Sequence, residues 1–276
     1  MSVEVLTEES TSRYTRAGDV RLHYHEAGSG PAVVLLHGGG PGATAWGNYA
    51  RNVAAFAAAH RVLLPDLPQF GKSDSPVLTE DRPLANARIL TAFFDAVGVE
   101  RASLVGNSMG GATALELAIH YPERVDKLVL MGSGGAGPSL FAVVPTEGDR
   151  LLRENFQHPT FDSMRRLIQV MVYDASFLTD ELVQKRLESA LNPAHREARR
   201  QSFRKPGEPR AELERVQAPT LIVWGREDRV NPFDQALGLL QGIRGAQLHV
   251  YTECGHWAQL EKADAFNRLV LDFLDH

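Results

Sequence analysis

A serine between glycines is the residue of this sequence best suited to covalent chemistry. Residues 106–110 read Gly-Asn-Ser-Met-Gly, which matches the pattern G-x-S-x-G around Ser108. An apolar run suited to a buried strand precedes the motif, and a run suited to a helix follows it. This order predicts a sharp strand–turn–helix elbow with Ser108 as a nucleophile and with helix N–H groups facing an oxyanion. The alternative is a structural serine in an ordinary turn.

A nucleophilic serine needs a histidine base and an acid that orients the base. After such an elbow the acid precedes the histidine along the chain. Asp228, which follows the strand-like run 220–224, is the expected acid, and its neighbour Glu227 is the competing choice. His256 is the expected base because it follows the last strand-like run in a glycine-containing loop. Cys254 lies close to it but lacks the partners of a nucleophile, so we expect a structural role.

A second glycine-rich run, His-Gly-Gly-Gly-Pro-Gly-Ala at 37–43, follows the strand-like run 32–36. We interpret it as an oxyanion loop, in which the backbone N–H groups of Gly39 and Met109 are the expected donors. The run also matches a dinucleotide-binding fingerprint, an alternative that the complete set of serine, aspartate and histidine disfavours. A P-loop fails because Asp66 stands where its first glycine would be. Since no metal-ligand spacing occurs either, we expect no cofactor and no metal.

The composition is that of a globular protein, with 276 residues, 43% hydrophobic and 23% charged side chains, and a net charge of −5. An acidic balance argues against nucleic-acid binding. The apolar runs are too short for a membrane span, and the N-terminal residues show no signal-peptide pattern. We therefore expect a cytoplasmic protein that acts on a small molecule and partners neither nucleic acid nor membrane.

Short apolar runs alternate with helical patterns, which is the order of an α/β fold built on a parallel sheet. An alternating run at 20–26 predicts an outer antiparallel strand. The buried strands are expected at 32–36, 61–64, 102–105, 127–131, 220–224 and 247–251. The helices are expected at 44–59, 84–97, 109–120, 233–241 and 262–274.

The long interval between the strand-like runs 127–131 and 220–224 contains helical patterns and no good strand. We interpret residues 139–210 as a helical lid inserted into a core domain formed by residues 1–138 and 211–276. Within it, residues 196–210 carry six Lys or Arg and two Asp or Glu. This basic stretch is either a solvated helix face or a rim that attracts an anionic substrate. The helical patterns of the lid lie at 146–156, 160–172, 179–190 and 194–202.

Taken together, these motifs resemble the α/β hydrolases, and more narrowly the meta-cleavage product hydrolases of aromatic and steroid ring degradation. The resemblance spans essentially the whole chain. It rests on the serine motif, the glycine loop with Trp-Gly-Asn at 46–48, Trp-Gly-Arg-Glu-Asp at 224–228 and Gly-His-Trp at 255–257. It implies an α/β-hydrolase fold with a mostly parallel eight-stranded sheet, flanking helices and an inserted lid. It also implies a homo-oligomer, a dimer or larger.

The activity implied by the resemblance is hydrolysis of a carbon–carbon bond in 2-hydroxy-6-oxohexa-2,4-dienoate compounds. The products are 2-hydroxypenta-2,4-dienoate and a carboxylic acid, so the partner is a small anionic dienoate. The sequence leaves open whether Ser108 forms an acyl-enzyme or a water molecule attacks directly. A carboxylesterase or thioesterase with the same triad is the alternative activity, and a ligand-binding receptor of this fold is the non-enzymatic alternative.

The resemblance also assigns residues to the substrate site. Arg186 in the lid corresponds to an arginine that contacts the dienoate, although it could instead be an ordinary surface arginine. Trp257 belongs to the substrate site by the same comparison, or else is a packing residue. Met171 and Val230 fall where family members vary the pocket for the distal substituent. The remaining positions carried over to the substrate site are Gly38, Asn48 and Asn107.

Overall fold

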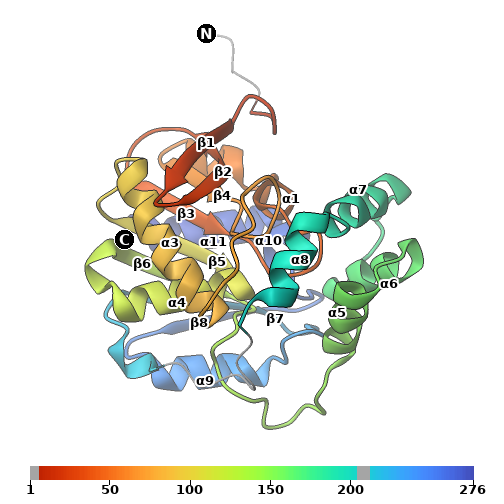
Figure 1. Cartoon of the computed structure of the whole chain (residues 1–276). Coiled ribbons are helices and arrows are strands. Elements are labelled where there is room, and N and C mark those ends of the chain that lie inside the picture. The colour runs from red at the N-terminus through yellow and green to blue at the C-terminus, as the bar shows by residue number, and fades with distance from the viewer. Residues whose placement is uncertain (1–5, 204–211) are drawn as a thin grey trace.

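The computed structural model describes residues 6–203 and 212–276, and these form an eight-stranded sheet with helices on both sides (Figure 1). The strand order is β1-β2-β4-β3-β5-β6-β7-β8. β2 pairs antiparallel with β1 and β4, and every other pair is parallel. The strands are β1 (Ser12–Ala17), β2 (Val20–Ala27), β3 (Ala32–Leu36), β4 (Arg61–Pro65), β5 (Ala102–Asn107), β6 (Val125–Met131), β7 (Thr220–Gly225) and β8 (Gln247–Tyr251). The mostly parallel eight-stranded sheet expected from the sequence is confirmed.

Strand β1 is the member of the sheet that the sequence analysis did not predict, and the expectation that the run 20–26 is the outer strand was wrong, because β2 is antiparallel but pairs with β1 on one side and β4 on the other. Strand β1 is an edge strand that pairs only with β2, and of its six residues only Ala17 is buried. An edge strand with a solvated outer side needs no apolar run. Its sequence, Ser-Arg-Tyr-Thr-Arg-Ala, therefore carries too weak a hydrophobic period to be recognised.

The strands inside the sheet are apolar throughout because helices cover both faces. Along β3, Val34 and Leu36 pack with one helical layer and Val33 and Leu35 pack with the other. Successive side chains of a strand point to opposite faces, so a doubly covered strand reads as an unbroken apolar run. One layer contains α3 (Arg82–Ala96), α4 (Met109–His120) and α9 (Asp234–Gly242), and the other contains α1 (Ala45–Tyr49), α2 (Val53–Ala57), α10 (Ala258–Glu261) and α11 (Ala263–Asp275).

The helix expected at 44–59 is instead two helices, α1 and α2, and the expectation of one continuous helix was wrong. Asn52, which is fully buried, lies between them. Its amide Nδ2 donates to the Asn267 side chain at 2.7 Å and to the Gln259 carbonyl at 3.0 Å. A buried asparagine needs such partners, and these bonds tie the interruption to the C-terminal helices. The C-terminal run 262–274 is present as α11, preceded by the separate short α10.

Four helices between β6 and β7 stand apart from the sheet, and the first three of them form an apolar cluster of their own (Figure 1). Two non-lid side chains, Val230 and Trp257, belong to this cluster and connect it to the loops after β7 and β8. Threonine caps begin three of the helices, which agrees with the patterns in the sequence. Residues 204–210 of the basic stretch lie outside the described residues. The helices are α5 (Glu147–Gln157), α6 (Phe161–Met171), α7 (Asp180–Ala190) and α8 (Pro193–Gln201), and short 3-10 turns occur at Pro122–Arg124 and Leu213–Arg215.

Over residues 6–203 and 212–276, the structure contains no helix with the length and apolar character needed to cross a bilayer.

Acid sensitivity of the fold is expected from His25 on β2. Its ring is buried, its Nδ1 lies 2.9 Å from the Thr11 hydroxyl, and burial, reinforced by neighbouring His23, lowers its pKa to about 4. Unfolded histidine titrates near pH 6.5, so the unfolded chain takes up a proton that the folded chain resists. This contribution to stability is complete above about pH 6.5 and is lost as the pH falls toward 4, by up to about 3 kcal/mol.

Urea unfolding of the wild type and His25→Gln at pH 7.5, 6 and 5 checks this expectation. The wild type should lose stability more steeply with falling pH than His25→Gln does. His276→Gln serves as the control, because that side chain is 81% exposed. Equal pH slopes for wild type and His25→Gln would show that His25 is not responsible.

Candidate active site

Ser108 lies at a strained turn between β5 and α4. Its backbone has φ 54° and ψ −114°, a combination that non-glycine residues rarely adopt. The turn is held by a bond from the Ser108 N–H to the Met131 carbonyl at 2.9 Å, and the Ser108 carbonyl accepts from Ala112 N–H at 2.9 Å. The strand–turn–helix elbow expected from the sequence is therefore present, and Ser108 lies on the wall of a cavity.

An aspartate and a histidine from two different loops form a buried pair beside the serine. His256 Nδ1 lies 2.7 Å from Asp228 Oδ2, and both side chains are almost completely buried. The other carboxylate oxygen, Oδ1, accepts the N–H groups of Val230 at 2.8 Å and Asn231 at 3.0 Å. These bonds fix the carboxylate, which in turn fixes the ring with Nδ1 as donor and leaves Nε2 to act as a base.

Glu227, the competing acid, has other partners. One of its oxygens accepts the Cys254 N–H at 3.1 Å, and the other pairs with Arg226. The structure thus joins Asp228, not Glu227, to the histidine. Cys254 is buried, and burial raises the pKa of its thiol well above the ordinary range. A thiol in that state is a poor nucleophile, in agreement with a structural role.

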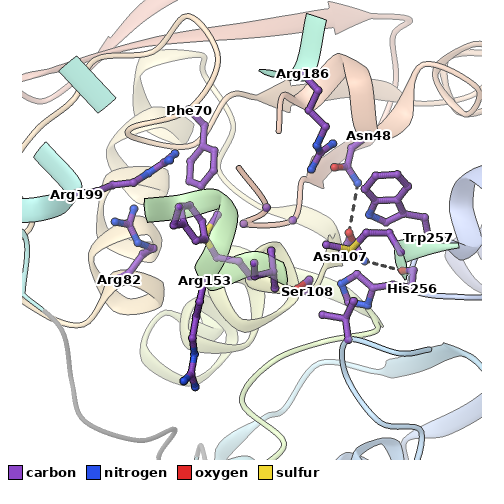
Figure 2. A pocket seen from close by; sticks show the side chains of 18 of the residues that line it. Asn48, Phe70, Arg82, Asn107, Ser108, Arg153, Arg186, Arg199, His256 and Trp257 are labelled. Atoms are coloured by element: carbon purple, nitrogen blue, oxygen red, sulfur yellow. Dashed lines mark hydrogen bonds between the residues drawn. The ribbon is translucent and has the colours of Figure 1, made fainter. Parts of the chain in front are cut away.

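Ser108 and His256 both line a cavity of about 500 Å³ between the sheet and the helices that connect β6 to β7 (Figure 2). Among the described residues no hydrogen bond joins the Ser108 hydroxyl to His256. Such contacts are often long in unliganded enzymes and shorten when substrate binds. The glycine loop lies beside the serine, since a Cβ atom added to Gly38 would lie 3.5 Å from the Ser108 Cβ. A Cβ on Gly39 would lie 2.9 Å from the sulfur of Met109, so the two expected oxyanion donors are neighbours.

Two buried asparagines connect the glycine loop region to the base. Asn107 Nδ2 donates to the backbone carbonyls of Met131 at 3.2 Å and His256 at 3.3 Å. Asn48 Nδ2 donates to Asn107 Oδ1 at 3.4 Å, as the dashed lines in Figure 2 show. Both side chains line the cavity. The side-chain amide of Asn107 therefore positions the backbone of His256. This contact could not be predicted from the location of Asn107 next to Ser108 in the sequence.

Arg186 brings an isolated positive charge to the same cavity from α7. Its guanidinium carbon lies 5.0 Å from the centre of the Trp257 ring, and its Nε is buried without a hydrogen-bond partner. No carboxylate of residues 6–203 and 212–276 pairs with it. Burial lowers the pKa of Arg186 to about 10, so the group still carries its charge at neutral pH. A buried cation without a counter-ion is costly, and it suits an anionic ligand that supplies a carboxylate.

The close approach of Arg186 depends on glycine in the facing loop. Gly42 has φ +71°, and a Cβ atom there would lie only 2.0 Å from the Arg186 carbonyl oxygen. The loop therefore packs directly on the backbone of α7.

The structure brings every predicted site residue except Asp228 to the wall of one cavity, and Asp228 lies behind His256. The residues on this wall are Gly38, Gly39, Asn48, Asn107, Ser108, Met109, Met171, Arg186, Val230, His256 and Trp257.

Several residues of the site were missed by the sequence analysis. Phe70, Arg82 and Phe156 line the cavity but belong to no motif, and Arg199, which also lines it, was expected only as one of several basic residues in the stretch 196–210. Glu261 was missed as well, although its carboxylate accepts the N–H groups of Tyr173 and Gly255, each at 2.7 Å, and so ties the histidine loop to the end of α6. No short-range signal marks these residues, because their partners are distant along the chain.

Comparison with known families identifies the class of protein. The family described as alpha/beta hydrolase fold matches residues 31–263. A 2-hydroxy-6-oxo-6-phenylhexa-2,4-dienoate hydrolase of Comamonas testosteroni is 49% identical, with 98% of each chain covered. A 2-hydroxy-6-oxononadienedioate/2-hydroxy-6-oxononatrienedioate hydrolase of Burkholderia vietnamiensis is 48% identical, with 97% of each covered. A solved meta-cleavage product hydrolase of Pseudomonas fluorescens superposes with a TM-score of 0.86 at 34% identity, covering 97% of this chain and 99% of that one.

The fold and the serine elbow are those of the α/β hydrolases, and the chain belongs to that family. Within this family, the chain is a meta-cleavage product hydrolase, a serine-type enzyme that hydrolyses carbon–carbon bonds. The family resemblance drawn from the motifs is thereby confirmed.

Proposed function

We propose that the enzyme binds a 2-hydroxy-6-oxohexa-2,4-dienoate in this cavity and hydrolyses its C5–C6 bond, giving 2-hydroxypenta-2,4-dienoate and a carboxylic acid. The observation that carries the proposal is the Arg186 guanidinium, which has no carboxylate partner among the described residues and lines the same cavity as Ser108 and His256. An esterase needs no buried cation at this place, whereas a dienoate needs a partner for its carboxylate. The printed activities of the relatives support the same substrate class.

The first step is conversion of the bound dienol to its keto form. The substrate carboxylate and the neighbouring 2-oxygen lie against Arg186, whose planar group can donate two parallel hydrogen bonds. The 2-hydroxyl loses its proton and C5 gains one. This step is needed because carbon is a poor leaving group, and the keto form provides a conjugated acceptor for the electrons of the bond that breaks.

The second step is attack by Ser108 on the C6 ketone. His256 takes the hydroxyl proton, and Asp228 stabilises the resulting imidazolium. The backbone N–H groups of Gly39 and Met109 hold the negative oxygen that forms at C6. Their neighbouring positions in the structure support this pairing.

The bond between C5 and C6 then breaks, and its electron pair moves through C4 and C3 to the oxygen on C2. The 2-oxygen takes back a proton, which yields 2-hydroxypenta-2,4-dienoate directly. The acyl group remains on Ser108 until His256 activates a water molecule, which releases the carboxylic acid and restores the serine.

We also propose that residues 139–210 act as the lid domain and residues 1–138 and 211–276 as the core. The separate apolar cluster of α5 to α7 supports this division. Met171 and Val230, members of that cluster on the cavity wall, would then shape the space for the rest of the substrate.

The proposal includes a homo-oligomer located in the cytoplasm. Leu140, Phe141 and Val143 are 80%, 81% and 88% exposed, an apolar surface that association would cover. The lone buried Cys254 is compatible with a reducing compartment. Light scattering on the purified chain and cell fractionation test the two statements.

The proposed activity is tested by mixing the purified enzyme with a coloured ring-fission dienoate and, separately, with a p-nitrophenyl ester. Rapid loss of the dienoate colour, with 2-hydroxypenta-2,4-dienoate as product, is expected. Fast ester hydrolysis without loss of the dienoate colour would identify an esterase instead.

Gly132→Ala is expected to lower kcat about 10-fold with a smaller effect on KM. Gly132 has φ +50°, and an added Cβ would lie 3.0 Å from His256 Nδ1 and 3.3 Å from Asp228 Oδ2. The pair would have to shift, and small misplacements of catalytic groups are costly in rate. Gly98→Ala is the matched control, because Gly98 also has positive φ but has no atom within 4 Å of the added Cβ. Equal losses of activity in the two variants would assign the effect to backbone strain alone.

A further inference from the structure

Two more arginines lie at the end of the cavity away from Arg186. Arg199 of α8 donates from Nη2 to the Gln69 carbonyl at 2.5 Å, and Arg82 of α3 donates from Nη2 to Gln69 Oε1 at 2.7 Å. Gln69 is fully buried and has φ 69°, a rare value for a residue with a side chain. Because Gln69 is neutral, it orients both guanidinium groups without cancelling their charge.

The position of Gln69 is itself fixed from other segments. Its Nε2 donates to the Pro76 carbonyl at 2.6 Å and to the Ser202 hydroxyl at 2.9 Å. The two arginines are thus attached to a rigid centre, which is the kind of support that a binding site requires.

Arg199 has no acidic partner among the described residues. Its guanidinium carbon lies 4.2 Å from the centre of the Phe70 ring and 5.3 Å from that of Phe156, and its Nε is buried without a hydrogen-bond partner. Burial, together with the like charge of Arg82, lowers the pKa of Arg199 to about 9, so it stays charged at neutral pH. A buried guanidinium without an acidic partner is unfavourable unless an anion of the ligand pairs with it, and the like charge of Arg82 adds to this cost for Arg199.

The two cationic ends lie on different sides of the nucleophile. Figure 2 shows Arg186 with Asn48 and Trp257 on one side, and Arg82 and Arg199 beside Phe70 on the other. Arginines outnumber acids on the wall: Asp81 is the one acidic side chain among the described residues that line it.

We propose that Arg199 binds a second carboxylate on the acyl side of the substrate, so that this enzyme prefers a dienedioate to a phenyl-substituted dienoate. This inference rests on the proposed function and extends it to the distal group. Sequence identity does not choose between these substrates, because relatives named for each are 49% and 48% identical. A neutral phenyl group would shield Arg199 from water without offering a counter-charge. The aromatic rings that lie against the Arg199 guanidinium are already supplied by the protein itself, from Phe70 and Phe156.

The test compares kcat/KM for 2-hydroxy-6-oxonona-2,4-dienedioate and 2-hydroxy-6-oxo-6-phenylhexa-2,4-dienoate at one ionic strength. The wild-type ratio of dioate to phenyl substrate should exceed one. Arg199→Gln should lower that ratio about 10- to 100-fold, the loss typical of charge-assisted hydrogen bonds. Arg199→Lys should retain part of it. Arg200→Gln is the matched control, because Arg200 is 72% exposed and pairs with Glu197.

Three other results are possible, and each of them contradicts either the role of Arg199, the preference for the dienedioate or the proposed function. If Arg199→Gln slows both substrates by the same factor, Arg199 has only a structural role and the proposal is wrong. A wild-type preference for the phenyl substrate would also overturn it while leaving the proposed carbon–carbon hydrolysis intact. If the wild type cleaves neither dienoate, the proposed function itself fails.

Discussion

Ser108→Ala is expected to lower kcat by about 10⁴- to 10⁶-fold while the affinity for the dienoate changes only a few-fold. The variant lacks the oxygen proposed to attack C6, but it keeps Arg186 and the backbone donors that are proposed to bind the substrate. Alanine loses only the hydroxyl, so the backbone strain at φ 54° remains similar. Rapid-mixing absorbance measurements give the rate of cleavage, and a titration followed by the dienoate spectrum gives the affinity.

Ser103→Ala is the matched control for this variant. Ser103 belongs to the same strand, β5, and is buried, but it is not on the cavity wall. Its kcat should remain within about 2-fold of wild type. If Ser108→Ala kept more than about one hundredth of the wild-type kcat, the serine oxygen would not be the attacking group, and a water molecule activated by His256 would take its place.

The elements that position the serine could be predicted because the signal is local. β5 and α4 follow one another without a loop, and the glycines on each side of Ser108 let strand and helix pass closely. The runs of apolar residues that mark the parallel strands follow from burial on both faces. These features depend on residues that are adjacent in the chain or on a hydrophobic pattern of short period, and both can be recognised in a single sequence.

The choice between adjacent side chains could not be predicted in the same way. Arg199 and Arg200 are neighbours in the basic stretch, yet Arg199 lines the cavity and Arg200 pairs with Glu197 at the surface. Consecutive residues of a helix differ by about 100° in direction, so the answer depends on how α8 packs. Asp228 and Glu227 differ from this case, because the sequence analysis expected Asp228 as the acid and the structure joins that carboxylate, not Glu227, to His256.

The charge of the basic stretch therefore has more than one use. Arg200 agrees with a solvated helix face, and Arg199 agrees with a rim that attracts an anion. The sequence analysis treated these as alternatives for the whole segment. In the described part of it they hold for different residues, because exposure changes from one helix position to the next.

Arg186→Gln is expected to lower kcat/KM by about 10²- to 10³-fold through both a higher KM and a lower kcat. KM rises because the dienoate carboxylate loses its charged partner. The rate falls because the negative charge that develops on the 2-oxygen, during ketonisation and again during cleavage, loses the same stabilisation. Rapid-mixing spectra should show slower formation of the keto intermediate as well as slower cleavage.

Lys185→Gln provides the control on the same helix, because Lys185 is 70% exposed and pairs with Glu8 at the surface. It should leave both spectral phases unchanged. If Arg186→Gln had wild-type kinetics in both phases, Arg186 would not contact the dienoate.

Thermal unfolding separates a functional from a structural role for this arginine. Removing a partner from a buried ion pair destabilises a protein by several kcal/mol, but Arg186 has no acidic partner among the described residues. Its removal relieves an uncompensated buried charge at the cost of its contact with Trp257. Arg186→Gln should therefore keep or raise Tm while losing activity, whereas a purely structural residue would lose both together.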